Sequence, residues 1–119
     1  MSAAPPTLPA VRARRAGPEL VLTLDLDPAL AGFQGHFPGD PILPGVVQVD
    51  WAARFGAEAF GPLGEFRGLA QVKFHRALRP GRRVDLHLAF DPARGQLRFA
   101  FRDGAELLSG GTLLFGARP

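Results

Sequence analysis

The sequence predicts an α+β fold in which an antiparallel sheet wraps around one central helix. An apolar segment over residues 45–60 has helical character and lies early in the chain. After it, apolar and polar side chains alternate in successive runs that turn-forming residues separate. One early helix followed by a long antiparallel sheet is typical of the α+β class.

Length and composition narrow the class of protein. The chain has 119 residues, of which 46% are hydrophobic and 21% are charged, so we expect a single globular domain. A domain of this size buries a modest core, which favours sharing an interface with another chain. No apolar run is long enough to span a membrane or to form a secretory signal, so we expect a cytoplasmic protein without a membrane partner.

Cysteine content, charge and motifs exclude further classes. The chain lacks cysteine, which excludes disulfides, zinc–thiolate centres and cysteine nucleophiles. Its net charge of +3 favours acidic partners, yet the sequence has no glycine-rich phosphate motif and no calcium-binding loop. We therefore expect no nucleotide cofactor and no nucleic-acid partner.

The segment before the helix contains a lead, a hairpin and a loop. Residues 1–10 are expected to form a flexible lead, and residues 11–119 the single domain. Alternation over residues 11–15 and 20–26, around a breaker at 16–19, predicts the hairpin. Residues 28–45 hold four glycines and four prolines, which exclude a long regular element. The interleaved apolar side chains predict an ordered, packed loop: Phe33, Phe37, Ile42 and Leu43.

The predicted helix begins near Pro44, where a first-turn proline is tolerated, and ends at Gly61 and Pro62. Its residues are apolar nearly all the way round, which is typical of a buried helix. Asp50, Arg54 and Glu58 follow at spacings of four and form one polar stripe. The alternative interpretation of this stripe is a solvated edge with a ladder of ion pairs.

Four further strands are predicted at residues 66–78, 84–90, 96–102 and 106–116. Three intervening turns suggest that consecutive strands are antiparallel neighbours. On that basis His75 and His87 would lie opposite each other across a turn near Gly81. Two histidines without a third ligand do not make a metal site, so we expect no metal and interpret both as surface residues.

The junction between loop and helix carries the residues suited to chemistry. His36 can act as a base on a carbon next to a carbonyl, since imidazole is neutral near pH 7. The free N–H of Gly45 at the helix N-terminus would stabilise negative charge on that carbonyl oxygen. Asp50 is the candidate donor of a proton to a leaving hydroxyl, provided that burial raises its pKa.

The segment GHFPGDPILPGVVQVDWA, residues 35–52, resembles the active-site signature of 3-hydroxyacyl-[acyl-carrier-protein] dehydratases of the FabZ and FabA type. It is similar in particular to the ApeI-like dehydratases of aryl polyene clusters, and the similarity extends over about residues 11–116. The resemblance implies a hotdog fold and a catalytic pair of His36 and Asp50. It also implies a dimer in which each site combines the loop of one chain with the helix of its partner.

The sequence departs from this family at Arg54, where the FabZ and FabA types usually carry glutamine. If Arg54 pairs with Asp50, the carboxylate is held ionised and its role as a proton donor is weakened. Asp50 would then act through an ordered water, or Arg54 would turn toward Glu58. The sequence leaves these alternatives open.

The resemblance also suggests residues that bind substrate and partner. Apolar side chains near the junction are candidates for an acyl-chain site, although Trp51 and Phe55 fit a core equally well. The substrate-binding candidates are Gly45, Phe37, Ile42, Trp51, Arg54 and Phe55. Four arginines around one turn would receive the acidic helix of an acyl carrier protein, or would be a solvated corner: Arg76, Arg79, Arg82 and Arg83.

The expected function is dehydration of a 3-hydroxyacyl thioester to the trans-2-enoyl thioester, in fatty acid, aryl polyene or polyketide-type biosynthesis, by a homodimer without a cofactor. One alternative is a hotdog thioesterase, although its water-activating site does not usually use this histidine motif. The other is a non-catalytic subunit that binds acyl carriers, an alternative that Arg54 keeps open. For His36 itself, the plain alternative is a loop histidine hydrogen-bonded to the backbone.

Overall fold

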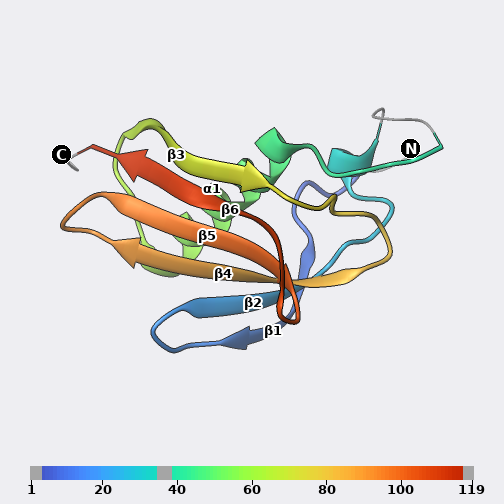
Figure 1. The fold of residues 1–119 in the computed structure, drawn as a ribbon, viewed down its shortest axis with the longest axis horizontal. Helices are drawn as coiled ribbons and strands as arrows, with labels where there is room; N and C mark the ends of the chain where they lie inside the picture. Colours follow the sequence, from blue (N-terminus) through green and yellow to red (C-terminus); the bar gives the residue numbers. More distant parts are fainter. Residues whose placement is uncertain (1–3, 35–38, 117–119) are drawn as a thin grey trace.

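A computed structural model of the chain describes residues 4–34 and 39–116. In this part of the chain, six strands and one long helix form two layers, with the helix on one side of the sheet (Figure 1). The elements in chain order are β1 (Ala10–Arg15), β2 (Leu20–Asp25), the 3₁₀ helix η1 (Ala31–Phe33), α1 (Gly45–Phe60), β3 (Phe66–Phe74), β4 (Arg83–Asp91), β5 (Gln96–Asp103) and β6 (Glu106–Phe115). The predicted α+β architecture is confirmed.

The strands form one antiparallel sheet in the order β1-β2-β4-β5-β6-β3. The predicted hairpin of β1 and β2 is present, and β4, β5 and β6 follow one another as a meander. The expectation that β3 lies beside β4 is wrong, because β2 pairs with β4 while β3 pairs with β6. His75, just after β3, and His87, on β4, are therefore not on neighbouring strands.

The inner face of the sheet packs on the helix and forms the core. Alternate residues of β2, β4 and β5 are buried, as their sequence pattern predicts. The fully buried inward side chains include Leu24, Leu86, Leu88, Leu97 and Phe101. A right-handed twist lets such a sheet curve around a single helix, so this core holds α1 in a fixed orientation.

The helix α1 buries one face and leaves the other open in the single chain. Its buried residues are Gln48, Trp51, Ala52, Phe55 and Gly56. Gly56 lets the helix approach β5, since an added Cβ would lie 2.7 Å from Leu97 Cδ2. Val46 on the other face is 77% exposed. The prediction of a helix buried all round therefore does not hold for one chain alone.

Part of the N-terminal lead contacts the domain. The Ala31 N–H donates to the carbonyl oxygen of Pro6 at 2.8 Å. The Trp51 indole N–H donates to the carbonyl oxygen of Thr7 at 2.9 Å. These two hydrogen bonds place Thr7 beside the helix.

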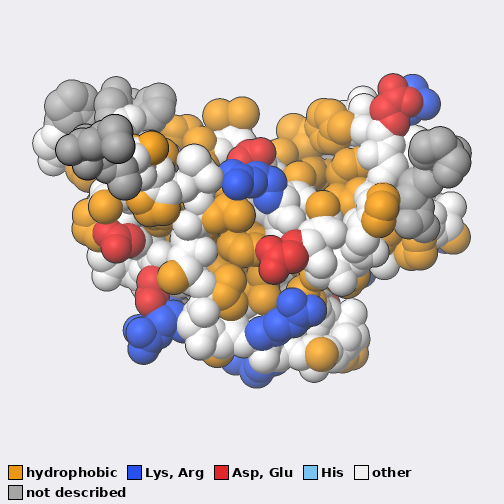
Figure 2. Space-filling view, turned by 180° about the vertical axis from the view of Figure 1, so that it is seen from behind, with side chains coloured by type: hydrophobic (Ala, Val, Ile, Leu, Met, Phe, Trp, Pro, Cys, Tyr) orange, Lys and Arg blue, Asp and Glu red, His pale blue; other side chains and the backbone are white. Residues whose placement is uncertain are grey.

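The strand β3 lies at one edge of the sheet and is largely exposed. Three of its large apolar side chains are exposed in the single chain, namely Phe66, Leu69 and Phe74. Figure 2, the view from the helix side, shows hydrophobic side chains at the surface between charged ones. An apolar surface beside an unpaired strand edge is typical of a face that another chain covers. No helix among the described residues is long and apolar enough to cross a membrane.

Two turn glycines offer a matched test of the sheet. Gly95 and Gly104 both have positive φ, 63° and 59°. An added Cβ at Gly95 would clash with the carbonyl oxygen of Phe115, whereas one at Gly104 would meet nothing within 4 Å. We expect Gly104→Ala to lower the free energy of unfolding by about 1 kcal/mol for its backbone conformation alone. Gly95→Ala should cost about 2–3 kcal/mol or more, because the backbone of β6 must also move.

Urea denaturation of both variants and the parent chain measures this difference. Equal losses would show that β6 yields freely beside the turn and that the close approach does not constrain the sheet.

Candidate active site

The tip of helix α1 is built by its own sequence and by Phe74. The amide N–H groups of Val47 and Gln48 both donate to the carbonyl oxygen of Pro44 at 3.1 Å. The N–H groups of Gly45 and Val46 have no hydrogen-bond acceptor among residues 4–34 and 39–116. A helix N-terminus with free N–H groups carries partial positive charge. This tip is therefore suited to a carbonyl oxygen that gains negative charge.

The ring of Phe74 approaches Gly45 so closely that a larger residue at this position would require the ring to move. An added Cβ at Gly45 would lie 2.5 Å from Cζ of Phe74. The ring of Phe74 therefore lies against the first turn of the helix, beside the two free N–H groups. This contact joins the helix tip to the exposed edge strand β3.

An apolar groove of about 550 Å³ runs between the open face of the helix and β3. The helix contributes Gly45, Val46, Val49, Asp50 and Ala53 to it. The opposite wall is apolar and comprises Phe66, Leu69, Val72, Phe74, Leu113 and Phe115. The predicted residues Gly45 and Asp50 thus share one groove, whose lining suits an acyl chain.

Asp50 forms an ion pair with Arg54 on the next turn of the helix. Their closest atoms, Asp50 Oδ2 and Arg54 Nη1, lie 3.6 Å apart, and the side chains are 57% and 43% exposed. The same Nη1 also donates to Thr7 Oγ1 at 3.2 Å. Of the alternatives left open by the sequence, the structure shows direct pairing of Arg54 with Asp50. In the single chain this polar stripe is solvated, and such exposed pairs contribute little to stability.

The predicted base, His36, and its neighbour Phe37 lie outside the described residues. Their part in the site stays a prediction from the sequence. The described chain resumes at Gly39 and leads through Ile42 to the helix tip.

A second hollow of about 480 Å³ adjoins the groove. Gly45 and Phe74 line both hollows, so the helix tip lies between them. Ile42, His75 and Arg76 also line the second hollow. A ligand whose carbonyl group lies at Gly45 has room to extend in both directions.

Trp51 and Phe55, candidates for substrate binding, lie in the core instead of the groove. Both are almost completely buried and point toward the sheet. The rotation of about 100° per residue along a helix turns Trp51 away from the direction in which Asp50 points. Their packing in the core holds the helix against the sheet.

Three of the four arginines predicted to dock a carrier are paired with aspartates. Arg79 pairs with Asp40 and Arg82 pairs with Asp103. Arg83 Nε lies 2.9 Å from Asp25 Oδ1. Arg76 has no carboxylate partner in the described part of the chain.

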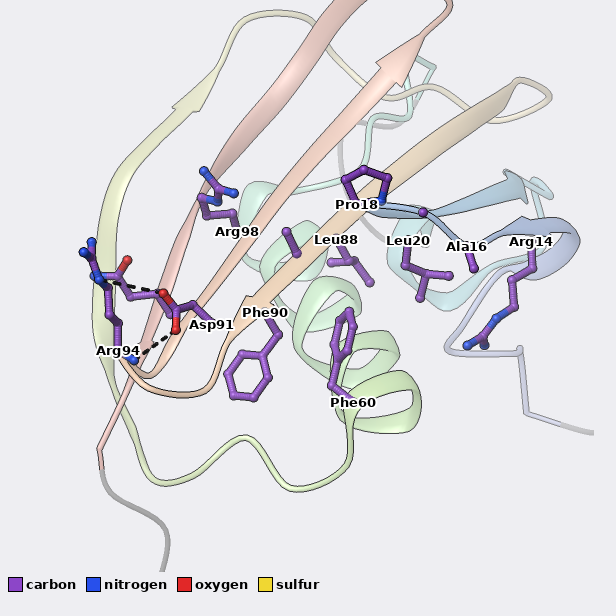
Figure 3. Close-up of a pocket in the computed structure, with 13 residues that line it drawn as sticks. Arg14, Ala16, Pro18, Leu20, Phe60, Leu88, Phe90, Asp91, Arg94 and Arg98 are labelled. Atoms are coloured by element: carbon purple, nitrogen blue, oxygen red, sulfur yellow. Dashed lines mark hydrogen bonds and ion pairs between the residues drawn. The ribbon is translucent and has the colours of Figure 1, made fainter.

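A further hollow of about 500 Å³ lies near the last turn of the helix (Figure 3). Phe60 and Phe90 border it with ring centroids 5.9 Å apart, and the ion pair of Asp91 and Arg94 closes one side. No residue of the predicted site lines it. Within the described ranges, no three side chains of the metal-ligating kinds gather closely enough to hold a metal ion.

The sequence prediction missed three polar residues near the site: Thr7, Gln48 and Ser109. Gln48 is one of only a few polar residues on an apolar helix, and this signal was available in the sequence. Its amide donates to the carbonyl oxygen of Leu43 at 3.0 Å and accepts from the Ser109 hydroxyl at 2.6 Å. No local pattern marks Thr7 or Ser109, because their partners lie far away in the chain.

Solved structures show the same architecture. One chain of a dehydratase heterocomplex, ApeI:P from Xenorhabdus doucetiae, superposes with a TM-score of 0.81 at 33% identity, over 89% of this chain and 96% of that one. An uncharacterized protein from Erwinia carotovora subsp. atroseptica gives 0.77 at 28% identity, over 90% and 94%. The dehydratase domain of the polyketide PpsC from Mycobacterium tuberculosis also shares the fold. It superposes with a TM-score of 0.69 at 19% identity, over 95% of this chain and 46% of that one. The expected hotdog fold is confirmed.

Curated relatives are dehydratases named FabZ. The enzyme of Pelotomaculum thermopropionicum is 33% identical over an alignment of 96 residues that covers 72% of this chain and 69% of the relative. That of Erythrobacter litoralis is 39% identical over 84 residues, 63% and 55% respectively. That of Oenococcus oeni is 39% identical over 72 residues, so the matched part spans about half of its length (52%) and 55% of this chain.

A family model gives a further match. The model described as ApeI-like, ApeI dehydratase, matches residues 12–112, which include the helix tip, Asp50 and four complete strands. Its match covers most of the chain and includes the segment that carries the predicted chemistry. The chain therefore belongs to the ApeI-like dehydratase family.

Proposed function

We propose that this protein dehydrates a 3-hydroxyacyl thioester, held by an acyl carrier protein, to the trans-2-enoyl thioester. The observation that carries the proposal is the shared groove, in which free N–H groups at Gly45 and the carboxylate of Asp50 border one apolar channel. Membership of a dehydratase family supports the same reaction. We also propose that the substrate is an acyl chain on a carrier protein and that the pathway is fatty acid, aryl polyene or polyketide-type biosynthesis.

The proposed reaction divides the work between two protein groups and the helix tip. The imidazole of His36 takes the proton from the carbon next to the thioester carbonyl, and the electron pair moves onto the carbonyl oxygen. The N–H groups of Gly45 and Val46 stabilise the resulting negative charge. The charge then returns to form the carbon–carbon double bond, and the hydroxyl on the next carbon leaves as water with a proton from Asp50.

Proton donation by Asp50 requires Arg54 to release it, because a carboxylate paired as an anion has no proton to give. The Thr7 hydroxyl already lies 3.2 Å from the guanidinium nitrogen that pairs with Asp50. Arg54 can keep this contact while Asp50 turns toward the substrate. The alternative route, through a water that Asp50 orients, needs no such movement.

A second chain is proposed to complete the site. The groove is open to solvent, and Val46, Phe66, Leu69 and Phe74 are exposed along it. A homodimer that pairs the β3 edges would cover these side chains and bring the loop of one copy to the helix of the other. Burial by the partner would also remove Asp50 from bulk water.

The second candidate function is a non-catalytic carrier-binding subunit. The exposed ion pair of Asp50 and Arg54 favours it, since Arg54 occupies the place next to Asp50 where dehydratases of the FabZ and FabA type usually carry glutamine. Such a subunit would bind an acyl carrier without changing the substrate. Loss of water from a 3-hydroxyacyl thioester, measured together with carrier binding, separates the two functions.

The central prediction concerns His36 and Asp50. Incubation with a 3-hydroxyacyl thioester should remove one water from the substrate, detected by mass. His36→Ala should abolish this activity and Asp50→Asn should reduce it by about 10²–10⁴-fold, the usual contribution of a proton-transfer group. The matched controls are His87→Ala, on β4 and outside both the groove and the second hollow, and Glu58→Gln, on the same helix as Asp50; both should retain activity.

Release of free thiol would instead indicate a thioesterase. An inactive protein that still binds the acyl carrier would support the non-catalytic subunit and overturn the proposed dehydration.

The shared site predicts complementation between inactive variants. If His36 and Asp50 of one site come from different copies, a mixed dimer of His36→Ala and Asp50→Asn chains contains one intact site. Refolding an equal mixture should then restore roughly a quarter of the parent activity, because half of the dimers are mixed and each has one working site of two. Each variant refolded alone is the control. Activity no greater than the sum of the two variants would place both groups in one chain or exclude a shared site.

If an acyl carrier protein docks on the arginines around residues 76–83, changing their charge should affect KM only for carrier-bound substrate. Arg79→Glu with Arg82→Glu should raise KM for carrier-bound substrate, because an acidic carrier then meets negative charge. KM for a short soluble thioester should not change. Arg94→Glu, which reverses a charge in the ion pair with Asp91 near the end of the helix, is the matched control. Equal effects on both substrates would refute docking at this corner.

A further inference from the structure

Gln48 and Ser109 are the two polar residues in the described chain that are almost completely buried, at 3% and 0% exposure. They come from different layers, since Gln48 is on helix α1 and Ser109 is on strand β6. Apolar side chains fill the remaining core around them. Burying two polar groups in such a core is unfavourable unless each is hydrogen-bonded, so this pair calls for a specific account.

The hydrogen bonds fix the orientation of the Gln48 amide. The carbonyl oxygen of Leu43 can only accept, so it receives the N–H of Gln48 Nε2 at 3.0 Å. The amide oxygen of Gln48 then faces the Ser109 hydroxyl, which donates to it at 2.6 Å. A chain of two hydrogen bonds therefore connects strand β6 to the loop that precedes the helix.

Leu43 is held from both sides of its backbone. Its N–H donates to the carbonyl oxygen of Leu78 at 2.8 Å, while its carbonyl oxygen accepts from Gln48. Strand β6 also anchors the chain beyond β3, because the carbonyl oxygen of Leu108 accepts from His75 and Arg76 at 2.8 and 3.0 Å. One residue separates Leu43 from Gly45, and that residue is a proline with a fixed φ. Little freedom remains between the anchored Leu43 and the N–H groups at the helix tip.

We propose that Gln48, supported by Ser109, is a positioning residue that holds the tip of helix α1 where the thioester carbonyl binds. Gln48 also borders the second hollow beside Gly45, so its amide lies close to the reacting end of the site. This inference rests on the proposed function, because it assigns the free N–H groups to the substrate carbonyl. An apolar side chain at position 48 would fill the same volume but would leave the Leu43 carbonyl without its donor.

The test separates positioning from stability. Gln48→Met replaces the amide with an apolar group of similar size, and it leaves the buried Ser109 hydroxyl without an acceptor. A double variant, Gln48→Met with Ser109→Ala, removes that hydroxyl as well. The double variant should therefore regain part of the thermal stability that Gln48→Met loses. In both, kcat should fall by about 10- to 100-fold with little change in KM, the scale of effect expected from a small misplacement of a catalytic group.

The control is Leu88→Val, a fully buried position on β4 that lies beside the other end of the helix. All kcat values are measured at a temperature at which circular dichroism shows every variant to be folded. Leu88→Val should keep kcat within about twofold of the parent, because its packing defect is remote from the helix tip. Recovery of kcat together with stability in the double variant would overturn the proposal and leave Gln48 a purely structural residue.

Hydrogen exchange provides a readout that does not depend on activity. Amides of residues 42–49 should exchange faster in Gln48→Met and in the double variant than in the parent or in Leu88→Val. Unchanged exchange there would refute the anchoring role even if activity falls. If the parent chain does not dehydrate any 3-hydroxyacyl thioester, the proposed function fails, and the exchange result alone decides whether Gln48 holds the tip.

Discussion

The packing of helix α1 against the inner face of the sheet is the contact on which the rest of the structure depends. Trp51, Phe55 and Gly56 turn toward β4 and β5, and this orientation leaves Asp50 and Val46 on the opposite side. Because a helix has a fixed angle between successive residues, the core and the groove are set by one rotation of the same element. Any change that rotated the helix would move the candidate acid out of the groove and expose the core.

The elements of the fold follow from local signals, whereas the order of the strands does not. Pro44 and Gly61 mark the ends of the helix because their backbone preferences act on the residues next to them. The neighbour of β3 is β6, which lies far along the chain, and no local pattern selects β6 over β4. Strand pairing across such distances is decided by how the whole sheet closes around the helix. The expected pairing of His75 and His87 failed for this reason.

The site was predictable where its residues share one segment and unpredictable where they do not. Gly45 and Asp50 are separated by little more than one turn of the helix, so the sequence places them on one groove. Trp51 was ambiguous, because an apolar helix does not show which half faces the sheet. Thr7 and Ser109 reach the site only through tertiary folding, and a single hydroxyl in the sequence carries no sign of a distant partner.

The proposed second chain would account for both the exposed ion pair of Asp50 and Arg54 and the open groove, because it would cover the face that carries them. Asp50 and its partner Arg54 are both exposed to solvent in the single chain. The same open side carries the exposed apolar residues of β3, and exposed apolar surface of this kind is typical of an interface with another chain. One covering chain would bury both features at once. In the proposed dimer, each chain would supply to a site both Asp50 and a helix tip for which we propose Gln48 as the anchor, and its partner would complete that site.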